Sequence, residues 1–193
     1  MVTVDMSFEE LKNQVDSSLT VEKLDEILLN LGLEIDAIEG DNLKVEIGAD
    51  RPDLISMQGL VRLLRAYLGS PYFGFDVTAS DRVVTIDSSV KDVWPHVVCA
   101  VVRGLTLSDD RLKEIINFQE KLHATFGRKR KKLGIGIYPL EKITFPVDYL
   151  ALPAKDVVFT PLGCEGSING HEILEKTEIC KTYAHLLEGK ESF

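Results

Sequence analysis

The sequence has few of the residues from which disulfide frameworks and metal sites are built. Its three cysteines, Cys99, Cys164 and Cys180, are an odd number without a C-x-x-C spacing, so neither a disulfide framework nor a zinc site is indicated. Its four histidines are scattered, and none belongs to an H-E-x-x-H motif. We therefore predict no metal site and interpret the cysteines as small core or surface residues.

Long apolar runs are also lacking. No stretch reaches the roughly 18 uninterrupted apolar residues of a membrane helix. The N-terminal residues Met1 to Asp5 do not have the charged and apolar regions of a signal peptide. With 45% apolar residues among 193, the chain can build one large domain or two small ones. We predict a soluble cytoplasmic protein without a membrane partner.

Charge is unevenly distributed, although its net value is −9. Residues 1–60 hold fourteen acids and four bases, whereas in residues 111–132 eight bases stand against two acids. A run of bases is usually a solvated face. The five bases from Arg128 to Lys132, however, lie between an expected helix end and an expected apolar strand, on a fixed scaffold. We call Phe118 to Lys132 the basic segment and predict that it is the surface for an anionic partner.

The predicted fold class is α+β, with two modules. Residues 1–75 are expected to form a small α+β module, in which Ser7 and Glu10 have the spacing of a capping box and Thr20 can cap a second helix. Apolar residues alternate with charged ones in two stretches that predict a hairpin. The expected strands are 2–5, 33–38 and 43–47, and a third helix is expected at 54–68 after a cap at Asp53.

The second predicted module, residues 82–193, mixes helices and strands and follows a boundary in residues 70–81. The nearly continuous apolar run from His96 to Arg103 predicts a strand buried on both faces. Ser108 can cap a helix over 109–126, with its apolar side facing the core at Leu112, Ile115, Ile116, Leu122 and Phe126. Further strands are expected at 83–87, 133–138, 147–152 and 157–162, and helices at 171–176 and 181–187. The chain stops at Phe193 without a closing strand, so we expect this module to be incomplete at its C-terminal end.

Gln119, Glu120 and Arg130 are the strongest candidates for chemistry. An amide and a carboxylate can orient a water, and a guanidinium can meet an ester or phosphate oxygen. Adjacent helix residues point about 100° apart, so Gln119 and Glu120 cannot face one cleft equally well. Spacing alone therefore favours a surface role. His123, one turn further along, is more readily interpreted as a helix-surface imidazole than as a catalytic one.

Two stretches carry a resemblance to a known family. Residues 50–69 begin Asp-Arg-Pro-Asp, and residues 118–137 contain Gln-Glu-Lys-Leu-His followed by Arg-Lys-Arg. They resemble the N-terminal half of phenylalanyl-tRNA synthetase β subunits of the archaeal and eukaryotic form. The Val-Thr-Val start, the Gly-Leu-Glu-Ile-Asp hairpin and the strand that ends Phe-Thr-Pro-Leu162 follow in the same order.

The resemblance implies a β subunit that pairs with an aminoacylating α subunit in an α2β2 assembly and takes phenylalanine tRNA as its partner. It implies ATP and magnesium for the complete synthetase, with no cofactor in this segment. It also implies that residues 82–193 are the front part of an editing domain, which hydrolyses tyrosine wrongly attached to that tRNA. By resemblance, Gln119, Glu120 and Arg130 lie at the ester bond and Leu162 near the terminal adenosine. The other residues expected to bind tRNA are Arg128, Lys129, Lys131, Lys132 and His123.

A second interpretation stays open. The chain can be a non-catalytic module that binds RNA through the basic segment, or a partner subunit through the acidic first module. Because the family's remaining pocket residues follow Phe193, we expect the fragment alone to be inactive in either case.

Overall fold

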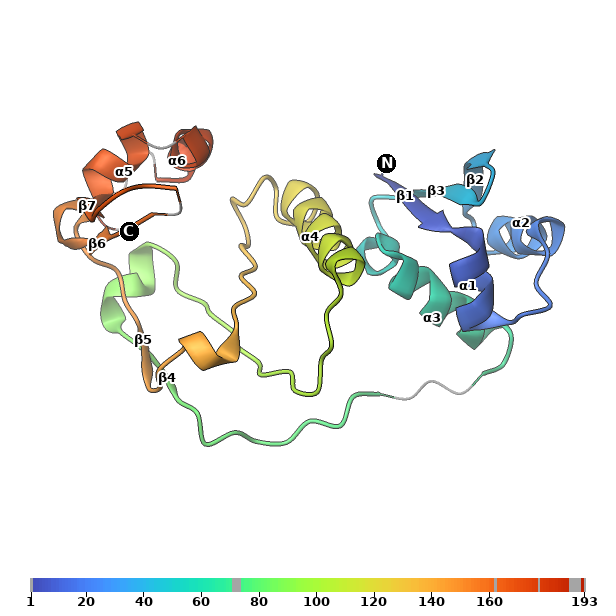
Figure 1. Cartoon of the computed structure of the whole chain (residues 1–193), viewed down its shortest axis with the longest axis horizontal. Helices are drawn as coiled ribbons and strands as arrows, with labels where there is room; N and C mark the ends of the chain where they lie inside the picture. The colour runs from blue at the N-terminus through green and yellow to red at the C-terminus, as the bar shows by residue number, and fades with distance from the viewer. Residues whose placement is uncertain (1, 71–73, 162, 177, 188–191, 193) are drawn as a thin grey trace. The chain divides into compact units, whose positions relative to one another are not determined.

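The computed structural model describes residues 2–70, 74–161, 163–176, 178–187 and 192. Its contacts divide the chain into two compact units, the first made of Met1–Val77 and Thr106–Ile135 and the second of Thr78–Leu105 and Gly136–Phe193. Both units combine helices with small sheets (Figure 1), which confirms the predicted α+β class. Among the described residues, no helix has the length and apolar composition that a membrane span requires.

A three-stranded antiparallel sheet in the order β1-β3-β2 forms the base of the first unit. β1 (Val2–Ser7) pairs with β3 (Asn42–Ile47), and β3 pairs with β2 (Glu34–Glu39) as the predicted hairpin. Successive side chains of a strand point to opposite faces of the sheet, and in β3 those on one face are buried. The buried residues of β3 are Leu43, Val45 and Ile47.

Two helices of this unit begin where their capping residues predict. α1 (Phe8–Val15) starts after Ser7, whose Oγ accepts a hydrogen bond from the N–H of Glu10 at 3.0 Å. α2 (Val21–Asn30) starts after Thr20, whose Oγ1 accepts from the N–H of Lys23 at 3.3 Å. Each side chain satisfies one of the four N–H groups that a helix start leaves unpaired.

The third helix, α3 (Met57–Tyr67), begins later than predicted. Pro52–Leu54 form a separate 3₁₀ turn, and Ser56 caps the helix by accepting from the N–H of Gly59 at 3.2 Å. A Cβ on Gly59 would lie 2.1 Å from the carbonyl oxygen of Asp53. Because Gly59 has no side chain, the first turn of α3 can lie close to the 3₁₀ turn that precedes it.

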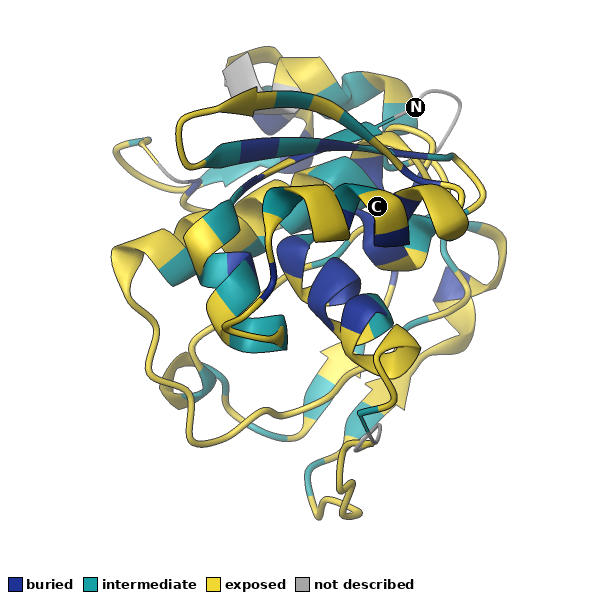
Figure 2. Cartoon of the chain, turned by 90° about the vertical axis from the view of Figure 1, so that its right-hand side faces the viewer, coloured by how far each residue is buried: buried dark blue, intermediate teal, exposed yellow. Residues whose placement is uncertain are grey.

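The hydrophobic core of the first unit lies between the sheet and these helices. Figure 2 shows that the buried positions follow one side of each helix while the opposite side is exposed, as expected for amphipathic helices. The side chains buried most completely in this core are Leu11, Leu24, Ile27, Leu28, Leu43, Val45, Ile47, Leu54, Leu60 and Leu64.

Asp41, in the hairpin turn, ties the start of α1 to the sheet. Its carboxylate accepts hydrogen bonds from the Ser7 hydroxyl at 2.6 Å and from the N–H of Glu9 at 2.9 Å. The hydrogen bond from Ser7, and to a smaller extent the one from Glu9, lowers the pKa of Asp41 below its ordinary value. The turn and the helix start thus form one local structure.

Helix α4 (Asp109–Ala124) is capped by Ser108, as predicted, but only part of its predicted core face is correct. Leu112, Ile116 and Phe126 are 43%, 47% and 61% exposed. Leu122, which was in the predicted face, packs against the core of the first unit, together with Phe118, which was not. The contacts of Phe118 and Leu122 group α4 with residues 1–77, whereas the predicted division placed this helix in the second module.

Within the described residues of the second unit, the strands pair into two short sheets. β4 (Val84–Ile86) and β5 (Val147–Tyr149) are parallel, and β6 (Val158–Phe159) and β7 (Ile168–Asn169) are antiparallel. Its helices are α5 (Gly170–Lys176) and α6 (Glu178–Tyr183). The remaining 3₁₀ turns of the described chain are Ser88–Asp92, Leu140–Lys142, Ala154–Asp156 and Ala184–Leu186.

The predicted strands at 96–103 and 133–138 are wrong. Both stretches are irregular, and Val98 is 97% exposed. An apolar run becomes a buried strand only where neighbouring strands take up its N–H and C=O groups. In the described part of the chain, the two short ladders of the second unit do not extend to either stretch.

Candidate functional site

The basic segment turns sharply at the end of α4. The N–H of Gly127 donates to the carbonyl of Leu122 at 2.8 Å, and the N–H of Arg130 donates to the carbonyl of His123 at 3.1 Å. A Cβ on Gly127 would lie 2.8 Å from the carbonyl oxygen of His123. Glycine at this position therefore allows the chain to fold back along the last turn of the helix.

Three consecutive residues in this turn have left-handed backbones. The φ angles of Arg128, Lys129 and Arg130 are 48°, 55° and 66°. For residues with a Cβ, this conformation is unfavourable by roughly 1–2 kcal/mol each. Such a conformation persists only where surrounding contacts hold it, and it concentrates at functional sites.

The turn brings Arg130 back onto the helix, beside the candidate carboxylate. Nη2 of Arg130 donates to Oε1 of Glu120 at 2.5 Å. The side-chain amide of Gln119 donates to the carbonyl oxygen of Ile135. The structure thus gathers Gln119, Glu120 and Arg130 at one end of α4, although Gln119 and Glu120 leave the helix in different directions.

His123 lies inside this cluster and is 2% exposed. Its Nδ1 lies 3.4 Å from Oε1 of Glu120, and its Nε2 accepts a hydrogen bond from the N–H of Ile135 at 2.8 Å. The interpretation of His123 as a helix-surface imidazole is therefore wrong. Since its ring is enclosed, any influence of His123 on a bound RNA passes through neighbouring groups.

The other bases of the turn face solvent. Arg128, Lys129, Lys131 and Lys132 are all exposed, and within the described ranges no carboxylate lies close enough to form an ion pair with them. Their charge is available to attract an anion. Leu162, the remaining predicted site residue, lies outside the described residues.

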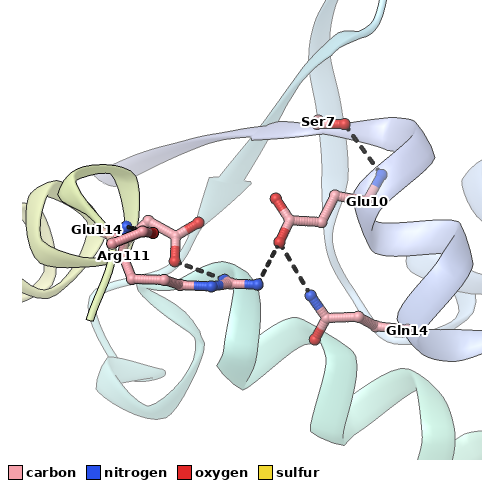
Figure 3. A network of polar contacts seen from close by, with 6 residues as sticks. Ser7, Glu10, Gln14, Arg111 and Glu114 are labelled. Atoms are coloured by element: carbon pink, nitrogen blue, oxygen red, sulfur yellow. Dashed lines mark hydrogen bonds and ion pairs between the residues drawn. The ribbon is translucent and has the colours of Figure 1, made fainter. Parts of the chain in front are cut away.

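A polar network fixes helix α4 to the N-terminal part of the first unit (Figure 3). The guanidinium of Arg111 contacts Oε1 of Glu10 and Oε2 of Glu114, each at 2.7 Å, and Glu10 also accepts from Gln14 at 3.3 Å. Hydrogen bonding to Glu114, with the charges of both carboxylates, raises the pKa of Arg111. Further along, Nζ of Lys121 donates to the carbonyl oxygen of Thr3 at 3.0 Å. These contacts hold the helix that carries the cluster.

A cavity of about 320 Å³ lies between β1, the start of α3 and α4. Its lining mixes apolar side chains such as Met6 and Phe118 with Glu10, Glu114 and Lys121, whose polar groups are already engaged in the network above. Nowhere in the described stretches do three or more His, Cys, Asp or Glu side chains gather to hold a metal ion. The cluster at the end of α4 is the candidate site.

Comparison with known proteins decides the family. Residues 1–70 match the model of the Phe-tRNA synthetase beta subunit B1 domain. Across 98% of its length, the chain is 39% identical to the phenylalanine–tRNA ligase beta subunit of Thermococcus onnurineus and 35% identical to that of Methanocella arvoryzae. A crystal structure of an N-terminal fragment of the phenylalanyl-tRNA synthetase beta-subunit from Pyrococcus horikoshii superimposes with a TM-score of 0.87. That fragment is 33% identical, and the match covers 99% of this chain and 57% of that one.

The chain belongs to the phenylalanyl-tRNA synthetase β-subunit family. The predicted resemblance is thereby confirmed. The chain spans about a third of the length of the curated relatives, 34% of the first and 35% of the second. The B1 match covers the sheet and helices α1 to α3, whereas the basic segment lies outside that match and inside the stretch that the synthetase β subunits share.

Proposed function

We propose that this chain is part of a β subunit that, with an α subunit in an α2β2 assembly, charges phenylalanine tRNA and hydrolyses tyrosyl-tRNA formed by error. The proposal includes a cytoplasmic location and ATP and magnesium for the charging reaction. The observation that carries the editing role is the convergence of Gln119, Glu120 and Arg130 beside four exposed bases. The proposed hydrolysis uses these side chains.

The need for such a site follows from the chemistry of the two amino acids. A pocket shaped for phenylalanine cannot strongly reject a near-isostere that adds only a hydroxyl group. A second site that recognises the hydroxyl can then remove the wrong product. In this proposal the synthetic pocket lies on the α subunit and residues 82–193 contribute to the second site.

The proposed step is hydrolysis of the ester that joins tyrosine to the terminal ribose of the tRNA. Glu120 or Gln119 orients a water, whose oxygen attacks the ester carbonyl carbon while its proton passes to the carboxylate or to solvent. The guanidinium of Arg130 stabilises the negative charge that develops on the carbonyl oxygen. The ester C–O bond then breaks, the leaving ribose oxygen takes up a proton from the carboxylate or from solvent, and tyrosine and the free ribose hydroxyl are released.

The exposed lysines should make RNA binding depend on salt. Each phosphate contact contributes about 0.9 to the slope of log affinity against log salt concentration for duplex nucleic acid. Replacing Lys129, Lys131 and Lys132 together with alanine should lower that slope by about 2 to 3, as measured by tRNA binding to the α2β2 assembly over a salt series. The matched control is Lys113→Ala on α4, because Lys113 already pairs with Asp110 at 3.3 Å. Equal slopes for the wild type and the triple variant would remove these lysines from the RNA interface.

A second function, a non-catalytic RNA- or subunit-binding module, has one observation in its favour. Glu120 is paired with Arg130, and the amide of Gln119 is bonded to the backbone, so each candidate group already has a partner within the chain. Such pairing is what a purely structural helix end requires. In that case the bases alone would carry the function.

Hydrolysis by the assembled synthetase separates the two functions. Purified α2β2 enzyme is mixed with tyrosyl-tRNA or phenylalanyl-tRNA, and the release of free amino acid is followed. Editing predicts release of tyrosine with phenylalanyl-tRNA left largely intact. Retention of both tRNAs without hydrolysis would favour the binding module.

A further inference from the structure

We infer that His123 is a positioning residue, which holds the Glu120 carboxylate, and through it Arg130, in the geometry that hydrolysis needs. The inference rests on the proposed function for its catalytic consequence. Its structural basis is independent, because His123 is the buried polar residue of the described chain, at 2% exposure. A ring enclosed in this way is held by its two nitrogen contacts.

The contacts of the ring select one tautomer. The backbone N–H of Ile135 can only donate, so Nε2 of His123 must accept and carries no proton. A neutral imidazole then carries its proton on Nδ1, which faces Oε1 of Glu120 at 3.4 Å. The donor side of the ring is thereby directed at the carboxylate.

Two groups meet at the same carboxylate oxygen. Oε1 of Glu120 lies within reach of Nδ1 of His123 and accepts from Nη2 of Arg130. The histidine approaches from one turn along the helix, and the arginine from the folded-back turn. Loss of the imidazole therefore removes one of the two groups that define the rotamer of Glu120.

His123 also connects both ends of the strained turn. Its carbonyl oxygen accepts from the N–H of Arg130 at 3.1 Å, and its ring accepts from the N–H of Ile135 at 2.8 Å. The left-handed residues Arg128 to Arg130 lie between these attachment points. One residue thus supplies contacts of the kind that a run of unfavourable φ angles requires.

The test replaces His123 in the α2β2 assembly with alanine and with glutamine. Glutamine can place a carbonyl oxygen near the position of Nε2 and accept from Ile135, but it cannot reproduce the Nδ1 donor. We expect His123→Ala to lower kcat for tyrosyl-tRNA hydrolysis between about 10- and 100-fold with little change in KM, since small misplacements of catalytic groups have effects of this size. The exposed His171, changed to glutamine, is the matched control.

A second readout does not depend on activity. Trypsin cleaves after lysine and arginine, so the rate of cleavage within Arg128–Lys132 reports how firmly the turn is held. We expect faster cleavage in His123→Ala and protection close to that of the wild type in His123→Gln. If the alanine variant does not fold, the kinetic test is made with His123→Gln alone.

The outcomes are distinguishable. If the wild type hydrolyses tyrosyl-tRNA, an unchanged kcat in the His123 variants overturns the inference, and a fall in kcat at constant KM supports it. If the wild type does not hydrolyse tyrosyl-tRNA, the proposed function fails. In that case, the trypsin cleavage rate still tests whether His123 holds the turn. Equal cleavage rates in the wild type and His123→Ala would show that it does not, and would overturn the inference.

Discussion

Replacing Arg130 with alanine in the complete synthetase is expected to slow hydrolysis of tyrosyl-tRNA by about 10²-fold, the effect of removing one charge-stabilising donor from a hydrolytic site. Arg130 is held against Glu120 by a left-handed turn, so its guanidinium is oriented before a substrate binds. Aminoacylation with phenylalanine should be unchanged, because in the proposed division of labour it takes place on the α subunit. The measurement is single-turnover release of tyrosine beside a standard charging assay.

Two further variants show which property of Arg130 matters. Arg130→Lys keeps the charge but not the planar fork of donors, and should recover only part of the rate. Arg128→Ala removes an exposed base from the same turn and should weaken tRNA binding without lowering the rate at saturating tRNA. A rate in Arg130→Ala equal to that of the wild type would exclude Arg130 from the site.

Replacing Leu28 with alanine is expected to lower the free energy of unfolding by about 2–5 kcal/mol. Leu28 lies on α2 at 1% exposure, inside the core of the first unit. Its truncation removes apolar contacts and leaves a cavity that the surrounding side chains fill only in part. Urea denaturation followed by circular dichroism measures the change.

The next residue along the same helix is the control. Leu29 is 56% exposed, so Leu29→Ala should change the free energy of unfolding by less than about 0.5 kcal/mol. The two variants remove the same atoms from adjacent positions with the same helix propensity. Similar effects at both positions would contradict the assignment of the buried face of α2.

The first 70 residues could be predicted well because their signals are local. The bond from Ser7 to Glu10, the cap at Thr20 and the alternation in the β3 strand each depend on residues a few positions apart. Periodicity and capping describe such interactions directly. The predicted start of α3 is too early because two possible caps, Asp53 and Ser56, lie three residues apart, and Ser56 is the one that caps the helix.

The second unit could be predicted only in part, because strands depend on distant partners. The strands at 147–152 and 157–162 are present in shortened form as β5 and β6, whereas the more apolar run from His96 to Arg103 is irregular. Hydrophobicity alone does not provide hydrogen bonds for a strand. The apolar side of α4 predicts that the helix packs against a core, but the pattern does not say which unit supplies that core.

The candidate site was recognised from resemblance, but its geometry could not be derived from spacing. The angle between Gln119 and Glu120 argued against a shared site, and the turn that brings Arg130 back has no glycine at its three left-handed positions. The local signal was Gly127, which permits the close return of the chain to the helix. The burial of His123 depends on that return and carried no signal of its own.

The most direct measurement is the rate of tyrosine release from tyrosyl-tRNA by an α2β2 assembly that carries Glu120→Gln and Arg130→Ala together. If the end of α4 is a hydrolytic site, the two residues act as a unit. The double variant should then be no more than a fewfold slower than the slower single variant, with charging of phenylalanine unaffected. A double variant that releases tyrosine as fast as the wild type would contradict the account.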